Sequence, residues 1–415
     1  MLPRERLPCT AVLCLSLMVA AAQARAQTPR PKVRAITAFI RIDLAQYQDQ
    51  VASTLVALRS AKAEYERSGY EVESLRITIQ PFSQFVADMS DTDVMAFCKH
   101  FDDLSTQNNF DANLGPAMLN DTDDPHAVEL LSKVLSATKN LEASVIVAGD
   151  DGLHPKAISA SARLLKYVEV NSVHSQGNFN FTATAMLLPY GPFYPGSYHL
   201  GTGHQFSIGL ESANVVEAVF AAHPGNYAEA GTFLAKELGR YAMDCERIAQ
   251  RVALQTGWTY AGIDATPAPL GTVSIGSAIE KLIEGRFGSS GTLTAASTIT
   301  RAVRSLSVKQ VGYTGLMVPV LEDATLAQRW TEGAYGIDSL LAYSAVCGTG
   351  LDTVPLPGDV SERQLGQILS DMASLAVKWR KPLSARLLPV AGKRAHDRTE
   401  FDDPFLVNAA LQPLP

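Results

Sequence analysis

The sequence predicts an α/β fold in which much of the sheet is parallel and buried. Short runs of β-branched and apolar residues recur along the chain, and many are separated by stretches with apolar residues at every third or fourth position. This alternation of strand and helix patterns is typical of α/β folds. No internal repeat, low-complexity segment or clear linker divides the chain, so we expect one domain over residues 34–415, preceded by a lead-in at residues 27–33.

Eight segments have the composition of strands. They are Val33–Ile40, Leu75–Ile79, Ser144–Ala148, Phe179–Leu188, Phe206–Leu210, Thr259–Ile263, Leu351–Leu356 and Ala385–Val390.

Five segments read as helices from their apolar spacing. Val51, Leu55, Leu58, Ala61 and Tyr65 fall on one helical face. The other helical segments are Leu365–Trp379, Ala230–Leu254 with an end at Gly257, Thr292–Ser305 and Asp338–Val346.

The N-terminus has the three parts of a secretory signal peptide. Arg4 and Arg6 form a positive region, an apolar run of about 13 residues follows, and Ala24-Arg25-Ala26 gives the small-x-small cleavage pattern. The apolar run is too short for a membrane span, which needs roughly 20 residues. We expect cleavage before Gln27 and a mature chain that is periplasmic or secreted, without an integral membrane segment.

Charge and cysteine content narrow the partners and cofactors. The net charge is −7, and cleavage removes three arginines and one glutamate, leaving −9. An acidic chain argues against nucleic acid as a partner. Cys98, Cys245 and Cys347 would remain, too few and too scattered for a disulfide framework or a structural zinc site, so we expect buried, inert thiols. A homo-oligomer is left open.

A Pro/Gly-rich stretch at residues 188–203 lies between two predicted strands and reads as a long loop over a site. It contains His199, and His204 directly follows it; the two histidines flank a Gly-Thr-Gly segment. Either histidine could transfer a proton or bind a metal, although a structural role is the more common one for an isolated histidine. Of the two, His199 is the better catalytic candidate.

Two carboxylates flank the strand predicted at Leu351–Leu356. Asp352 lies at its start and Asp359 follows its end. They could bind a hard cation or share acid and base roles. Asp359-x-x-Glu362 also precedes a helix and is typical of a capping box. We therefore favour helix capping for Asp359 and chemistry for Asp352.

Asp264 ends the strand predicted at Thr259–Ile263, and two prolines follow. Ligands of α/β folds commonly meet the carboxyl ends of strands, which favours a catalytic or cation-binding role. An aspartate that accepts hydrogen bonds within a turn is equally compatible with the pattern. Asp150 and Asp151 could likewise have a catalytic role or accept hydrogen bonds within a turn, and for them we favour the turn.

Arg386 stands inside the apolar run Ala385–Val390. A buried guanidinium needs a partner, so Arg386 either pairs with a structural acid or clamps an anionic ligand. Lys393 could add a second positive group for substrate binding. The chain has no phosphate-loop, HExxH or GxSxG motif, and therefore no nucleotide is expected.

The motifs, taken in order, resemble an uncharacterised bacterial family named domain of unknown function 711, also called uncharacterised protein family 0210. The resemblance runs from about residue 33 to about residue 414. The segments that carry it are Lys32–Ile40, Gly196–Gly201 with His199, Gly262–Pro269, Cys347–Asp359, Ala385–Lys393 and Glu400-Phe401.

The resemblance implies a barrel-like sheet surrounded by helices, similar to the barrel of pyruvate formate-lyase and other glycyl-radical enzymes. It brings no reaction with it. Glycyl-radical chemistry is not expected, because the chain has no radical loop near its C-terminus and an exported protein meets oxygen. Ser290 stands where relatives often carry histidine, and Asp402-Asp403-Pro404 replaces a glycine-rich segment and would reshape the mouth of the site.

We expect an enzyme that acts on a small anionic or polar molecule at the strand C-termini, with a divalent cation as an optional cofactor. Asp352 and Asp264 would be acid/base groups or cation ligands, Arg386 and Lys393 would bind substrate, and His199 would transfer a proton. This hypothesis requires one cavity lined by Asp264, Asp352, Arg386 and His199. The alternatives are a two-lobed solute-binding protein of the cell envelope and a family member that has lost its activity.

Overall fold

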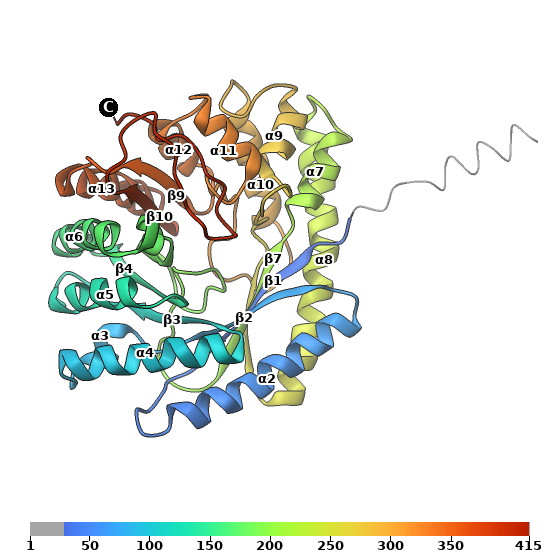
Figure 1. Ribbon diagram of the computed structural model, residues 1–415. Coiled ribbons are helices and arrows are strands. Elements are labelled where there is room, and N and C mark those ends of the chain that lie inside the picture. Colours follow the sequence, from blue (N-terminus) through green and yellow to red (C-terminus); the bar gives the residue numbers. More distant parts are fainter. Residues whose placement is uncertain (1–28, 415) are drawn as a thin grey trace, which may run out of the picture.

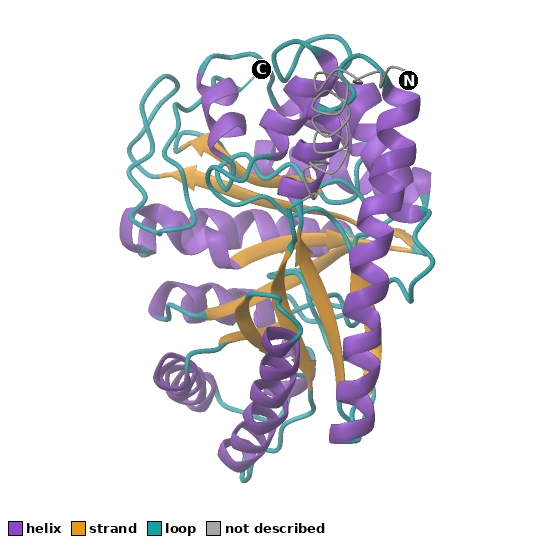
Figure 2. Ribbon diagram, turned by 90° about the vertical axis from the view of Figure 1, so that its right-hand side faces the viewer, coloured by secondary structure: helices purple, strands orange, loops and turns teal. Residues whose placement is uncertain are grey.

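The computed structural model describes residues 29–414 and shows a mixed α/β fold built on one ten-stranded sheet (Figures 1 and 2). The strand order is β8-β7-β1-β2-β3-β4-β6-β10-β9, and the short β5 pairs with β4. The strands are β1 (Lys32–Phe39), β2 (Val72–Thr78), β3 (Asp111–Pro116), β4 (Leu141–Gly149), β5 (Gly152–Leu153), β6 (Phe181–Ala185), β7 (Gln205–Glu211), β8 (Thr259–Asp264), β9 (Gly350–Pro357) and β10 (Leu383–Val390).

The sheet consists of a parallel centre with a reversed pair of strands on each side. β1, β2, β3, β4 and β6 run parallel to one another. β7 is antiparallel to β1 and pairs in parallel with β8. β10 is antiparallel to β6 and pairs in parallel with β9. The expected α/β class with a largely parallel sheet is therefore confirmed.

Helices surround the sheet, and a second group covers its upper end in Figure 1. They are α2 (Tyr47–Arg67), α3 (Phe82–Val86), α4 (Asp91–Asn108), α5 (His126–Ala137), α6 (Pro155–Asn171), α7 (Ala213–Ala221), α8 (Tyr227–Thr256), α9 (Ile275–Ile283), α10 (Thr292–Arg304), α11 (Ala324–Thr331), α12 (Ile337–Ser344) and α13 (Glu362–Trp379), with a 3-10 segment η1 (Val173–Asn180).

The helices α2 and α8 form as their sequences predict. The five apolar residues that share one face of α2, from Val51 to Tyr65, are all buried. α8 ends at Gly257, which caps it with a left-handed backbone (φ 72°), a conformation that glycine adopts without a steric penalty.

The start of α13 corrects one prediction. Ser361 is the N-cap, and its hydroxyl accepts a hydrogen bond from the Gln364 backbone N–H, while the Gln364 side chain reaches back to Ser361. Asp359 is exposed and lies outside this capping box. The capping pattern was thus recognised two residues too early, because Ser-x-x-Gln satisfies the same geometry as Asp-x-x-Glu.

The strand β3 was not predicted, although it lies in the middle of the sheet. Its sequence contains Gly115 and Pro116, residues that usually mark turns. Gly115 has a φ of 67°, and a Cβ there would lie 3.0 Å from the Pro81 backbone. The glycine therefore permits a close approach of two chain segments inside the fold.

One segment contacts both edge strands of the sheet. Gln310 forms a β-bridge with Ile263 of β8, and Pro319 forms another with Asp352 of β9. The exposed hydrogen-bonding edges of the sheet are therefore both partly covered by residues 310–319.

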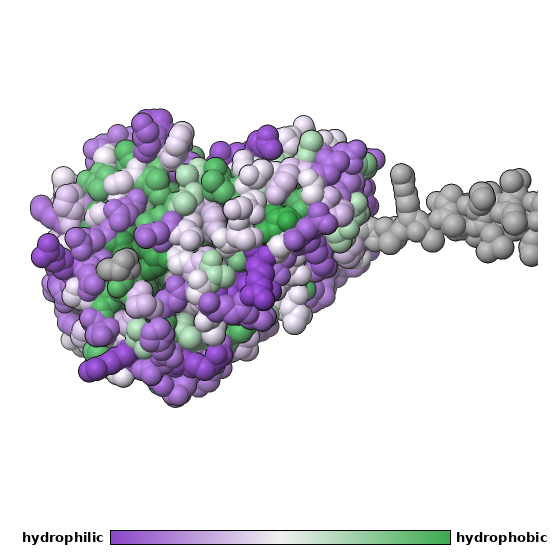
Figure 3. Space-filling model, turned by 90° about the horizontal axis from the view of Figure 1, so that it is seen from above, coloured by the Kyte–Doolittle hydropathy of each residue, from purple (hydrophilic) through white to green (hydrophobic). Residues whose placement is uncertain are grey.

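The thiols are as expected: Cys98, Cys245 and Cys347 are buried and unbridged. The sheet begins at Lys32, so the predicted lead-in ends slightly earlier than residue 33. The predicted signal peptide lies outside the described residues. Within residues 29–414 we find no helix that is long and apolar enough to cross a membrane. The face in Figure 3 is largely hydrophilic, with several hydrophobic patches.

Candidate functional site: a charged cavity on the inner side of the sheet

A cavity of about 650 Å³ is lined by residues of β1, β2, β3, β4, β6, β9 and β10. Each of the five parallel strands lines the cavity with a residue among its first three: Arg34, Glu73, Asp111, Glu142 and Thr182. In β2 the lining continues to Arg76, the fifth residue of that strand. The cavity therefore lies toward the amino-terminal ends of these strands. The expectation of a site at their C-terminal ends is wrong for this cavity.

Arg34 lies at the centre of an ion-pair network. Its guanidinium is 3.1 Å from Glu73, 3.2 Å from Glu211 and 3.5 Å from Glu322. Burial raises the pKa of Glu211, and the neighbouring Glu73 carboxylate raises it further, whereas Arg34 lowers the pKa of Glu73. One carboxyl of this pair thus retains a proton more readily than the other.

Arg386 continues the same network. Its guanidinium binds Asp352 at 2.8 Å and also binds Glu322. Burial alone would lower the pKa of Arg386, but the two carboxylates raise it above its usual value. Of the two interpretations of Arg386, the structure shows the pairing with acids; Arg386 also lines the cavity.

Glu142 differs from the other interior carboxyls because it has no partner. Within the described part of the chain, no hydrogen bond or ion pair reaches its carboxyl group. The side chain keeps some accessible surface and lines the cavity, yet the surrounding protein removes most of its hydration. This desolvation raises the pKa of Glu142 to about 8, against the opposing effect of Arg76.

The loop at residues 188–203 packs into the inner side of the sheet. The Pro192 carbonyl accepts hydrogen bonds from Thr37 and Arg76, and Asn113 donates to the Pro195 carbonyl at 2.8 Å. Phe193, Tyr194 and Pro195 line the cavity. The loop that the sequence predicts over a site therefore lies against this cavity.

Asp403 and Phe405 form part of the cavity wall. Phe405 is partly exposed, and the Arg34 guanidinium lies 5.5 Å from the centre of its ring. Burial raises the pKa of Asp403. The segment that departs from the glycine-rich family pattern thus contributes to this wall.

Asp264 lies outside the cavity and organises a turn. Its carboxylate accepts hydrogen bonds from the Thr266 N–H (3.0 Å) and hydroxyl (2.5 Å), and from the backbone N–H groups of Tyr313 (2.7 Å) and Thr314 (3.3 Å). Burial raises the pKa of Asp264 to about 6, although these hydrogen bonds oppose the shift. A Cβ at Gly312 would stand 2.3 Å from this carboxylate, so glycine is required there.

His199 and Lys393 are also outside the cavity lining. His199 is buried, and its Nε2 is 3.0 Å from Gln205 Oε1. Burial lowers the pKa of His199. Lys393 forms an ion pair with Glu400 at 2.8 Å. His204 is exposed and packs beside Trp258.

The structure therefore brings together two of the four residues that the sequence hypothesis placed in one cavity. Asp352 and Arg386 line it, whereas Asp264 and His199 do not. None of the cavities described here is lined by all four residues. Asp352 and Asp264, the proposed cation ligands, do not lie in the same cavity. Residues 29–414 contain no group of three or more His, Cys, Asp or Glu side chains placed to hold a metal ion.

Sequence reasoning missed Arg34, Arg76 and Glu142, although the signal used for Arg386 was present. Arg34 and Arg76 stand inside predicted strands, and Glu142 lies two residues before one. A charge within a buried strand needs a partner or a cavity, wherever it occurs. Applying this rule to every predicted strand would have selected Arg34 and Arg76, but not Glu142, which lies outside the predicted strand.

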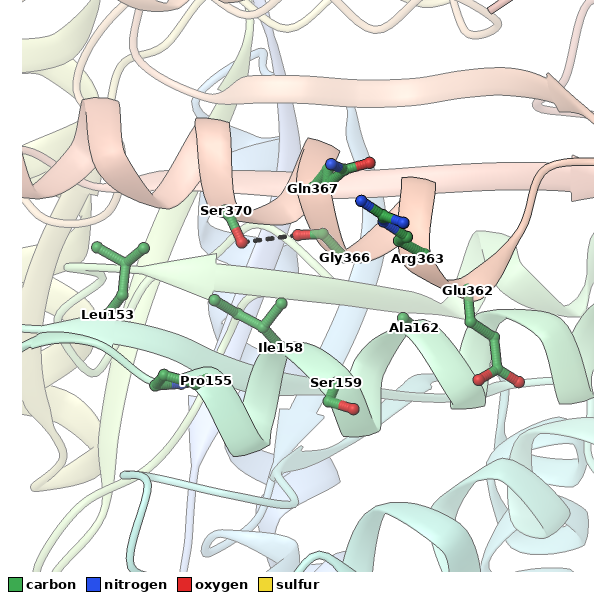
Figure 4. A pocket seen from close by; sticks show the side chains of 10 residues that line it. All are labelled: Leu153, Pro155, Ile158, Ser159, Ala162, Glu362, Arg363, Gly366, Gln367 and Ser370. Carbon is green, nitrogen blue, oxygen red and sulfur yellow. Dashed lines mark hydrogen bonds between the residues drawn. The ribbon is translucent and has the colours of Figure 1, made fainter.

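A second hollow, of about 410 Å³, lies between α6 and α13 (Figure 4). Its lining includes Ile158, Ala162 and Gly366, with Glu362 and Arg363 as its charged residues. Ser370 donates its hydroxyl hydrogen to the Gly366 carbonyl, as expected for a serine within a helix. This second hollow lacks the cluster of buried charged side chains that lines the first cavity.

The fold and the cavity together define an α/β protein with a charged interior site. The chain belongs to the family described as "Uncharacterised ACR (DUF711)", whose sequence model matches residues 26–402. It is 29% identical to a UPF0210 protein of Pyrobaculum aerophilum over 88% of this chain and 86% of that protein. It is 27% identical to a UPF0210 protein of Desulforudis audaxviator over 81% of this chain and 78% of that protein.

The family is broader than expected, because Pyrobaculum is archaeal. Ser290, which stands where the family resemblance implied a histidine, is exposed and lies outside the cavity.

Proposed function

We propose that this protein is an enzyme that transfers a proton to or from a small polar molecule bound in the cavity inside the sheet. The observation that carries the proposal is the unpartnered Glu142 carboxyl at the cavity wall. A group with a pKa of about 8 can both give and take a proton near neutral pH, which is what general acid–base catalysis requires.

The substrate in this proposal is polar but not anionic. The interior arginines already bind carboxylates: Arg34 pairs with three, Arg386 with two, and Arg76 lies 3.3 Å from Asp111. At Arg34 and Arg386 an anionic substrate would have to displace a buried pair, at a cost of several kcal/mol. At Arg76 it would compete with the more exposed Asp111. Asp352 and Arg386 are better suited to holding Glu322 and the cavity wall in place.

We further propose that the sheet closes into a barrel of the kind that the resemblance to glycyl-radical enzymes implies. β1 and β10 are five strands apart in the sheet order, or roughly 24 Å in a flat sheet. Yet Arg34 of β1 and Arg386 of β10 bind the same carboxylate. Strong curvature and the bridges of Gln310 and Pro319 to both edges support closure.

The alternatives are less well supported. A solute-binding protein would need two lobes around a cleft, whereas one continuous sheet supplies walls to this cavity. A lapsed enzyme was suggested by Ser290, but this exposed residue does not line the cavity.

The experiment that tests the proposal is deuterium exchange. The purified protein is incubated in deuterated water with a defined mixture of amines, amino alcohols, sugars and polyols, and NMR follows loss of carbon-bound protons and conversion of each component. We expect the wild type to process at least one component, and Glu142→Gln to slow this by about 10²–10⁴-fold. Asp359→Asn, which alters an exposed acid, is the control. Equal rates in wild type and Glu142→Gln, or no processing by either, would overturn the proposal.

We also propose that the mature protein works in the periplasm or outside the cell. The sequence pattern of residues 1–26 supports export, and the family match begins at residue 26, so the first 25 residues lie outside the part shared with relatives. N-terminal sequencing of the protein from fractionated cells of its source tests this.

A further inference from the structure

We propose that the ligand of the cavity carries a positive charge, such as a protonated amine, and that Glu142 is its counter-ion. This inference rests on the proposed function and adds the chemical class of the substrate. It follows from an imbalance in the cavity wall: five basic side chains face seven acidic ones.

The excess of acidic side chains persists away from the rim: without the more exposed Lys62, Lys139, Glu71 and Asp111, three basic and five acidic side chains remain. Lys62 and Lys139 have substantial exposure, which leaves Arg34, Arg76 and Arg386 as the deep cations. Each of them is paired with at least one carboxylate. Within the described residues, the interior therefore offers no free cation to an anionic ligand, but it does offer a free carboxyl group on Glu142.

The aromatic wall favours the same chemistry. The Arg76 guanidinium lies 4.7 Å from the centre of the Tyr194 ring, and the Arg386 guanidinium lies 4.7 Å from that of Phe179. Both rings line the cavity. Aromatic faces attract cations through the ring quadrupole, so the wall already stabilises positive groups at two places.

Proton linkage makes the proposal measurable. With a pKa of about 8, Glu142 is mostly protonated at pH 7. A cation binds the carboxylate form, so its binding must release a proton. Affinity should therefore rise nearly tenfold per pH unit below pH 8 and level off above it. A neutral ligand that hydrogen-bonds to the protonated acid would release none.

The test uses three probes of equal chain length: 1,5-diaminopentane, 1,5-pentanediol and glutarate. Calorimetry of the folded mature chain in buffers of different ionisation enthalpy gives both affinity and proton release. We expect the diamine to bind at least about tenfold more tightly than the other two and to release close to one proton at pH 7. Glu142→Gln should weaken diamine binding at least about tenfold and abolish the proton release. Glu142→Asp should restore part of both, and Glu362→Gln, in the groove between α6 and α13, should change neither.

The outcomes separate the two proposals. If the diol or glutarate binds more tightly and Glu142→Gln weakens that binding, the cavity remains the site and only the positive charge is overturned. If the diamine fails to bind, or binds without proton release, the positive charge is also overturned. If Glu142→Gln alters neither binding nor proton release, the assignment of Glu142 in both proposals falls.

Discussion

Arg34 and Arg386 bind the same carboxylate, Glu322, although they stand on strands five positions apart in the sheet. The network extends to Glu73 and Glu211 on one side and to Asp352 on the other. It links β1, β2 and β7 to β9 and β10 across the cavity. These charges therefore link the strands that form the cavity wall, and the proposal of a ligand that is not anionic rests on their pairing with the arginines.

Arg386→Met should lower the free energy of unfolding by about 3–5 kcal/mol, because it leaves Glu322 and Asp352 buried without their shared cation. Urea unfolding at neutral pH measures this loss. Lys393→Met is the matched control: its partner Glu400 is exposed to water, so the change should have little effect. Equal effects of the two substitutions would contradict the network's structural role.

Asp264→Ala should destabilise the protein without altering the chemistry of the cavity. The substitution removes the acceptor of three backbone N–H groups and one hydroxyl, and a buried orphaned donor costs about 1–3 kcal/mol. Unfolding and the deuterium-exchange assay are compared at a temperature where the variant is folded. A catalytic Asp264 would show the reverse, with exchange lost and stability retained.

Stability should fall as the pH rises from about 5 to about 8. Glu142 and Glu211 have folded pKa values above those of the unfolded chain, so the native state holds more protons in this window. Each carboxyl contributes at most about 1.4 kcal/mol per pH unit. Glu142→Gln should make the dependence shallower. Denaturant unfolding across the window gives the slope, and a stability that rises equally in both proteins would be inconsistent with protonated carboxyls.

The sequence was sufficient for the elements that follow simple periodicity. The apolar faces of α2 and α8 and the eight predicted strands all form, because local pattern and tertiary burial agree there. β3 was not predicted because Gly115 and Pro116 are typical of a turn. Its pairing with β2 and β4, which the local sequence does not indicate, makes this segment a strand.

The site was less accessible to sequence reasoning. Asp352 and Arg386 were found because each is a charge in an apolar run, and the structure brings them together. Asp264 was placed by the rule that ligands meet strand C-termini, but this cavity lies toward the other ends of the parallel strands. Whether a residue such as Glu142 faces the cavity depends on the curvature of the sheet. The spacing of strands along the chain does not encode that curvature.

Export predicts a mature N-terminus at Gln27. Mass spectrometry of the protein purified from envelope and extracellular fractions would identify this terminus. Ala26→Asp should block processing, because signal peptidase requires a small residue there, whereas a change at Arg25, between the two small residues, is the control. A protein that retains Met1–Ala26 in the cytoplasmic fraction would contradict export.

The most direct test of the central claim is the titration of Glu142 itself. Carbon NMR of protein labelled at glutamate carboxyls, with the Glu142 resonance assigned by its loss in Glu142→Gln, gives its pKa in the empty cavity. We predict a value of about 8, set by desolvation at the cavity wall. A value near that of a free glutamate, about 4.3, would show a hydrated or paired carboxylate and would contradict the account.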